Sequence, residues 1–140
     1  MTPWAHRRRA ACAAGAVLVG AICLAAGSAP VTAEQASLEG TWSGGGTVIL
    51  PTGDRERARC RATFHRKSAS LFGMNAVCAT SSTRVAQTAE LSRTSANRFS
   101  GEFYNADFAI SGSISVTVRG NSLIATLSGG GGSAHFTLSR

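Results

Sequence analysis

The sequence predicts an all-β protein, folded as a small antiparallel up-and-down barrel of about eight strands. Apolar and polar residues alternate widely after residue 33, and no stretch there has a helical period. Turn residues interrupt this alternation at strand-length intervals. One face of the predicted strands is apolar and the other is rich in Ser and Thr, as in a sheet wrapped around its own core. Closing such a sheet removes both exposed edges, so we prefer a barrel to the alternative, a two-sheet β-sandwich.

Eight segments carry this pattern, and short turns join them as in a meander. The first runs from about Gly40 to Leu50, the second from Arg55 to His65, the third from Ala69 to Ala79, the fourth from Arg84 to Ser92, the fifth through Phe99 and Phe103, the sixth from Phe108 to Val118, the seventh from Leu123 to Leu127 and the eighth from Ala134 to Ser139. The inward residues are often small, among them Gly44, Gly46, Ala58, Gly101 and Gly112. Small inward residues suit sharply bent strands, and we expect a narrow barrel without a roomy cavity.

Residues 1–33 have the layout of a cleavable secretory signal peptide. Residues 6–9 are basic, residues 10–26 form an apolar run, and Val31 and Ala33 are the small residues that signal peptidase requires. The alternative is a membrane anchor, because a run of 17 residues is near the lower limit for a membrane span. Its Ala-rich composition and the cleavage site favour a signal peptide. We therefore expect a periplasmic or secreted protein with no membrane span after cleavage.

Cleavage would leave residues 34–140, a single domain of 107 residues. The chain carries +7, and three arginines leave with the signal, so the mature charge is +4. A charge of this size gives no reason to expect nucleic-acid binding. Of the four cysteines, Cys60 and Cys78 remain. They fall on the inward faces of neighbouring predicted strands, so we expect a disulfide bond rather than two free thiols.

Residues Gly40-Thr41-Trp42 resemble the Gly-x-Trp opening of the lipocalin and calycin barrels. The resemblance implies that Trp42 closes one end of the barrel beneath a basic side chain, either Arg119 or Arg140. The chain length and the single cysteine pair look like the bacterial metalloprotease inhibitors of the Inh type, and also like small uncharacterised envelope proteins of alphaproteobacteria. The inhibitor resemblance implies a partner-binding N-terminal segment, which here consists of Glu34, Gln35, Ala36, Ser37 and Leu38.

No motif in the mature chain indicates catalysis. His65 and His135 lack metal-ligand spacing, and the acidic residues, Glu56 among them, are expected in turns or on outward strand positions. The run Gly129–Gly132 lacks the Lys of a phosphate-binding loop and suggests a flexible hairpin loop. We therefore predict a protein that is not an enzyme, with no catalytic residues, no metal and no cofactor.

An arginine ladder is the most unusual local feature. We give this name to Arg55, Arg57, Arg59 and Arg61, which project from one face of the second predicted strand about 7 Å apart. Aligned guanidinium groups suit anionic groups, which they bind through forked hydrogen bonds. The alternative, which we favour, is a solvated face with acidic partners across the strands, supplied by Glu90 or Glu102.

These patterns rank three function classes. The first is an exported, non-enzymatic binding or interaction module, in its sharper form an inhibitor of a secreted protease. The second is a carrier of small ligands or lipids of calycin type, which a cavity lined by Phe and Ile would support. The third is an envelope protein that binds anionic polymers, which a ladder free of acidic neighbours would support.

Overall fold

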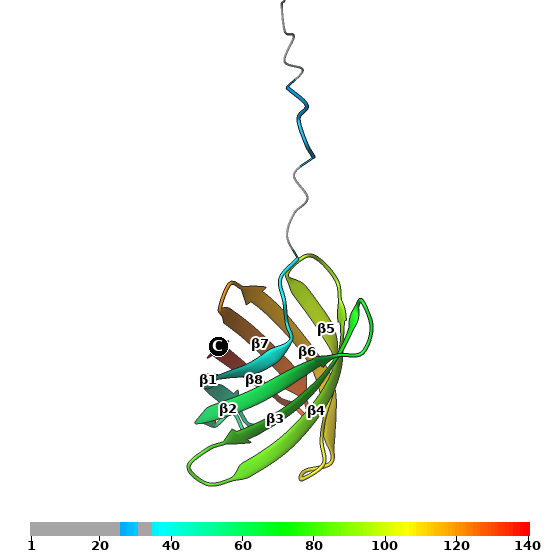
Figure 1. The fold of residues 1–140 in the computed structure, drawn as a ribbon. Helices are drawn as coiled ribbons and strands as arrows, with labels where there is room; N and C mark the ends of the chain where they lie inside the picture. The colour runs from blue at the N-terminus through cyan, green and yellow to red at the C-terminus, as the bar shows by residue number, and fades with distance from the viewer. Residues whose placement is uncertain (1–25, 31–34) are drawn as a thin grey trace, which may run out of the picture. The chain divides into compact units, whose positions relative to one another are not determined.

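A computed structural model describes residues 26–30 and 35–140. The second range contains eight strands: β1 (Gly40–Ile49), β2 (Arg55–Arg66), β3 (Leu71–Ala79), β4 (Arg84–Arg93), β5 (Arg98–Asn105), β6 (Ile110–Arg119), β7 (Ser122–Gly129) and β8 (Gly132–Ser139). Each strand pairs antiparallel with the next, and β8 pairs with β1, so the sheet closes into a barrel (Figure 1). The predicted up-and-down barrel is confirmed, and the sandwich alternative is wrong.

The predicted cleavage site lies outside the described residues, as does most of the predicted signal peptide, so both stay predictions. Within the two described ranges, no helix has the length and hydrophobicity needed to cross a membrane.

Two glycines show why the strands can bend sharply enough to close. A side chain at Gly46 would collide with the backbone oxygen of His135 on β8, and one at Gly101 would collide with the backbone oxygen of Glu90 on β4. Neighbouring backbones approach closely at these points, which only residues without a Cβ permit. The close approach of the neighbouring strand therefore requires glycine at both inward positions.

The glycine run forms the expected hairpin between β7 and β8. Gly129 pairs with Gly132, and Gly130 and Gly131 form the turn, at φ values of 61° and 80°. Two consecutive positive φ angles are typical of a tight two-residue hairpin. The sixth strand begins at Ile110 rather than at Phe108.

Phe108 was expected to point inward from that strand, but it lies in the turn before β6 and is 56% exposed. The residue after it, Ala109, has a positive φ of 53°. This left-handed conformation breaks the extended chain between Phe108 and Ile110, so the two side chains do not continue one alternating pattern.

The barrel has two unlike ends, because odd-numbered strands all run one way and even-numbered strands the other. The closed end, where β1, β3, β5 and β7 begin, holds the largest fully buried side chains: Leu38, Trp42, Phe72, Leu91, Phe99 and Leu123. At the open end, where β2, β4, β6 and β8 begin, inward positions such as Val48, Val85 and Ala134 are only partly buried. The difference places the candidate site at the open end.

Candidate functional site

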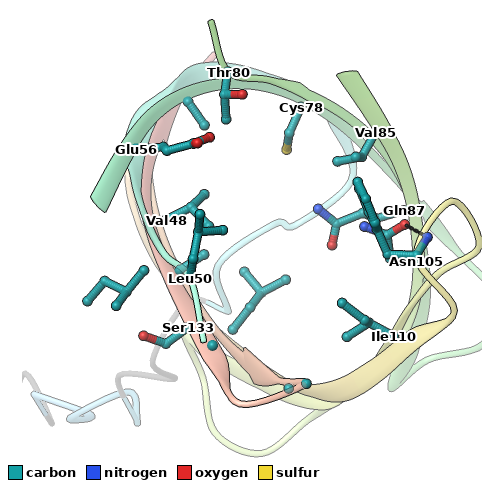
Figure 2. A pocket seen from close by; sticks show the side chains of 18 of the residues that line it. Val48, Leu50, Glu56, Cys78, Thr80, Val85, Gln87, Asn105, Ile110 and Ser133 are labelled. Atoms are coloured by element: carbon teal, nitrogen blue, oxygen red, sulfur yellow. Dashed lines mark hydrogen bonds between the residues drawn. The ribbon is translucent and has the colours of Figure 1, made fainter. Parts of the chain in front are cut away.

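The open end of the barrel contains a cavity of about 320 Å³. Figure 2 looks into it and shows side chains from opposite walls pointing toward one another. Most of the lining is apolar, and its principal members are Val48, Phe103, Phe108, Ile110, Leu127 and Phe136. A cavity of this size and character falls at the lower end of the range of small-molecule sites.

The cavity arises from small side chains at inward positions. Ala58 on β2 and Ala134 on β8 line it, and neither side chain extends beyond Cβ. The radius of a closed barrel depends on the number and stagger of its strands, so small side chains leave empty space rather than drawing the walls together. A narrow barrel without a roomy cavity was expected, and the structure has a cavity of modest size, about 320 Å³.

Two amides on neighbouring strands supply hydrogen-bonding groups at the mouth. Gln87 on β4 and Asn105 on β5 are directly paired and both line the cavity. Asn105 is 8% exposed, and its side-chain oxygen accepts hydrogen bonds from the backbone N–H groups of Asp107 at 3.0 Å and Phe108 at 3.3 Å. The side chain of Asn105 thus shapes the turn that carries Phe108 to the rim.

Glu56 faces these amides from the opposite wall (Figure 2). It is the only charged residue among those that line the cavity in the part of the chain that the structure describes. The expectation that this acid lies in a turn or on an outward position is wrong. Glu56 is two residues before Ala58 in β2, and alternation gives both the same inward face. Extending the alternating pattern to the start of the strand would have found it.

The predicted disulfide is confirmed, and it forms one wall of the site. Cys60 and Cys78 are directly opposite each other on β2 and β3, with 4.1 Å between their Cα atoms. Both are buried, and Cys78 lines the cavity. The bond ties together the strand that carries Glu56 and its neighbour, which restrains one side of the mouth.

The opposite end is closed by Trp42, which is 0% exposed. Its indole N–H donates to the backbone oxygen of Leu38 at 2.9 Å. Arg140 lies over the indole ring, 4.2 Å from its centroid, and donates to the backbone oxygen of Glu39 at 3.0 Å. Of the two basic residues that the resemblance offered for this position, Arg140 occupies it and Arg119 does not.

The candidate partner-binding segment is attached to this closed end. Glu34 lies outside the described residues, while Gln35 and Ser37 are exposed. Ala36 donates its backbone N–H to the oxygen of Ala96 at 3.0 Å, and its own oxygen accepts from Arg93 at 3.0 Å. Leu38 is fully buried. Residues 36–38 are therefore packed into the closed end of the barrel.

The arginine ladder lies on the outer face of β2, with Arg55, Arg57, Arg59 and Arg61 all exposed. Among the described residues, the ion pairs are Arg66 with Glu39 and Lys67 with Glu90, so the ladder takes part in none.

The acidic partners proposed for the ladder are elsewhere. Glu90 bonds Lys67 at 2.8 Å, and Glu102 is paired with Glu90 across β4 and β5, away from β2. On β1 and β3, the residues directly opposite Arg59 are Gly45 and Ala79. The ladder is thus free of the neighbours that were expected to neutralise it.

The two histidines do not meet. His65 lies across Gly73 on the outer surface, and His135 bonds the hydroxyl of Thr126 at 3.3 Å. Within the described ranges, no three His, Cys, Asp or Glu residues are grouped so that they could hold a metal ion.

No family model matches the sequence, and no curated protein matches it. Among solved structures, the chain is similar to the redesigned barrel mFAP1 bound to DFHBI, with a TM-score of 0.63 and 15% identity over 74% of this chain and 94% of that one. It is also similar to a de novo designed fluorescence-activating β-barrel, with a TM-score of 0.57 and 14% identity over 73% of this chain and 92% of that one.

At such identities the likeness shows the fold alone. The chain is a closed, eight-stranded, all-antiparallel barrel, and it shares this fold with the designed barrels. No match supports the resemblance to metalloprotease inhibitors.

Proposed function

We propose that this barrel is a non-enzymatic binding protein for a small, largely apolar ligand, which enters at the open end. The apolar cavity of about 320 Å³ is the observation that carries the proposal. Its Phe and Ile side chains are those expected of a calycin-type carrier. The solved barrels to which this chain is similar include binders of the small molecule DFHBI, which is consistent with a ligand site inside such a fold.

We also propose that the protein works outside the cytoplasm. The Cys60–Cys78 disulfide is compatible with a periplasmic or extracellular compartment, because small exported domains often depend on such bonds. The predicted signal peptide agrees with this location and is tested by N-terminal sequencing of the exported chain, with Glu34 expected first.

A direct test of the cavity uses Nile red, a neutral dye whose fluorescence rises in apolar surroundings. Ala134 lines the cavity, so Ala134→Phe should fill the space that the dye needs and weaken its affinity at least about tenfold. Ala79→Phe is the matched control, because Ala79 is exposed on the outer face near the same end of the barrel. We expect the control to bind like the parent. Equal binding by the parent and Ala134→Phe would contradict a site in the cavity.

A second candidate is binding of anionic envelope polymers through the arginine ladder. It is favoured by the lack of ion pairs to the ladder among the described residues and by neutral neighbours such as Gly45 and Ala79 on the flanking strands. Arg59 and Arg61 also share an outer depression with Arg84, which adds a third guanidinium group to the same surface. Replacing Arg57 and Arg59 with Gln and comparing the heparin affinity of this variant with that of the parent tests this candidate.

Inhibition of a secreted protease is the remaining function expected from the sequence. It requires the segment of residues 34–38 to reach into an active-site cleft. The bonds at Ala36 and the burial of Leu38 hold the described part of this segment against the barrel, so we rank this function last.

A further inference from the structure

Glu56 is a carboxylate placed where the strand pattern calls for an apolar side chain. The inward residues that follow it on β2 are Ala58, Cys60, Ala62 and Phe64, all buried. Glu56 itself is partly exposed and points into the mouth of the cavity between Val48 and Thr80 (Figure 2). A charged group beside apolar surface is unfavourable unless it finds a partner or remains hydrated.

The protein supplies no cation for this carboxylate among the described residues. Glu56 takes part in neither of their ion pairs, and none of their Arg or Lys side chains lines the cavity. Its neighbours Arg55 and Arg57 are exposed on the outer face. The interior of the mouth is thus negative in a barrel whose outer surface is rich in arginine.

Aromatic rings make the same cavity favourable to a cation. Phe103, Phe108 and Phe136 line it, and the face of an aromatic ring attracts positive charge. At the closed end the protein itself meets this preference, since Arg93 lies 4.6 Å from the ring centroid of Phe99 and Arg140 lies over Trp42. In the described part of the cavity, no guanidinium group lies over the three phenylalanines.

We propose that the cavity selects organic cations, specifically protonated amines on an apolar body, with Glu56 as the residue that pairs with the amine. This inference rests on the proposed ligand-binding function and names its ligand class. The apolar body lies among the phenylalanines, and the ammonium group donates hydrogen bonds to Glu56 at the mouth. Gln87 and Asn105, on the opposite wall, offer neutral hydrogen-bonding groups to any further polar atom.

Anionic ligands are excluded by the same arrangement. A carboxylate at the mouth would face Glu56, and no lining Arg or Lys would compensate the repulsion. A hydrogen bond between an ammonium group and a partly buried carboxylate discriminates against a neutral analogue by about tenfold or more. We therefore expect an affinity order of amine, then alcohol, then carboxylate.

The test uses three naphthalene probes that differ in charge: 1-naphthylmethylamine, 1-naphthylmethanol and 1-naphthoate. Each is titrated as a competitor of Nile red at pH 7 and low salt. In Glu56→Gln we expect the amine to lose about tenfold in affinity, the alcohol to change less than about twofold, and the carboxylate to bind more tightly. Glu102→Gln is the matched control, since it removes the same charge from an exposed outward position on β5.

Equal affinity of the amine and the alcohol in the parent would overturn the inference without any variant. An equal loss in Glu102→Gln and Glu56→Gln would also overturn it, because the effect would then come from overall charge. Nile red and the alcohol separate the two proposals. If both bind and the amine has no advantage, only the cation inference fails; if no probe binds, the cavity is not a ligand site and both fail.

Discussion

The same eight strands form two ends with opposite properties. The closed end is filled by six large side chains that are less than 2% exposed, including Trp42 and Phe99, and is covered by the segment around Ala36. The open end has small and partly buried side chains around a cavity and a carboxylate at its mouth. Packing is concentrated where the chain enters and leaves the barrel, and the cavity lies at the other end.

Guanidinium groups complete the closed end. Arg93 contacts the rings of both Phe72 and Phe99 and donates to the backbone oxygens of Ala36 and Ala96. The side chain of Arg93 therefore connects the N-terminal segment, the β4–β5 turn and the aromatic core. In the described part of the open end no arginine has this role, and the aromatic side chains there border empty space.

The largest expected effect separates two phenylalanines, one from each end. Phe99 is 1% exposed and Phe108 is 56% exposed. Phe99→Ala leaves a cavity in the closed end and should cost about 3–5 kcal/mol of unfolding free energy. Phe108→Ala should cost less than about 1 kcal/mol, because that side chain is already largely in solvent. Urea unfolding followed by circular dichroism measures both. Similar losses would mean that stability is spread evenly over the two ends.

A smaller effect distinguishes the two arginines offered for the Trp42 site. Arg140→Met keeps an apolar chain over the indole but removes the charge and the bond to Glu39, so we expect a loss of about 1–2 kcal/mol. Arg119→Met removes the same charge from an exposed position at the end of β6 and should change stability by less than about 0.5 kcal/mol. Thermal unfolding measures the stability of both variants. Equal losses of stability would mean that Arg140 does not help to close the barrel.

The outer face between the two ends should contribute little to stability. Replacing Arg57 and Arg59 with Gln should change the unfolding free energy by less than about 1 kcal/mol, because both side chains are exposed. If the arginine ladder binds polyanions, this variant elutes from heparin at lower salt than the parent. A control with Arg98→Gln and Arg119→Gln has the same net charge as the ladder variant. It should elute from heparin at higher salt than the ladder variant does. Identical early elution of the parent and both variants would make the ladder a solubilising face.

Local residue patterns predicted most of the strand arrangement of the barrel. Alternation and turn residues identified the eight strands and their inward faces, because a strand places successive side chains on opposite faces whatever surrounds it. The same reasoning placed Cys60 and Cys78 on facing strands. It failed at Phe108, where the positive φ of Ala109 breaks the pattern, and it was not extended far enough to find Glu56 on the inward face.

Alternation and the positions of the cysteines were thus enough to predict the order of the strands, the direction of most of their side chains and the disulfide. The folded barrel was needed to show that Arg140 covers Trp42, that Ala36 is bonded to Ala96, and that Glu56 faces Gln87 and Asn105 across a cavity. Side-chain direction depends on one strand and its two-residue repeat. The space left inside depends on how all eight strands close, how far each is staggered and which side chains meet from distant parts of the chain, and no local pattern contains that information.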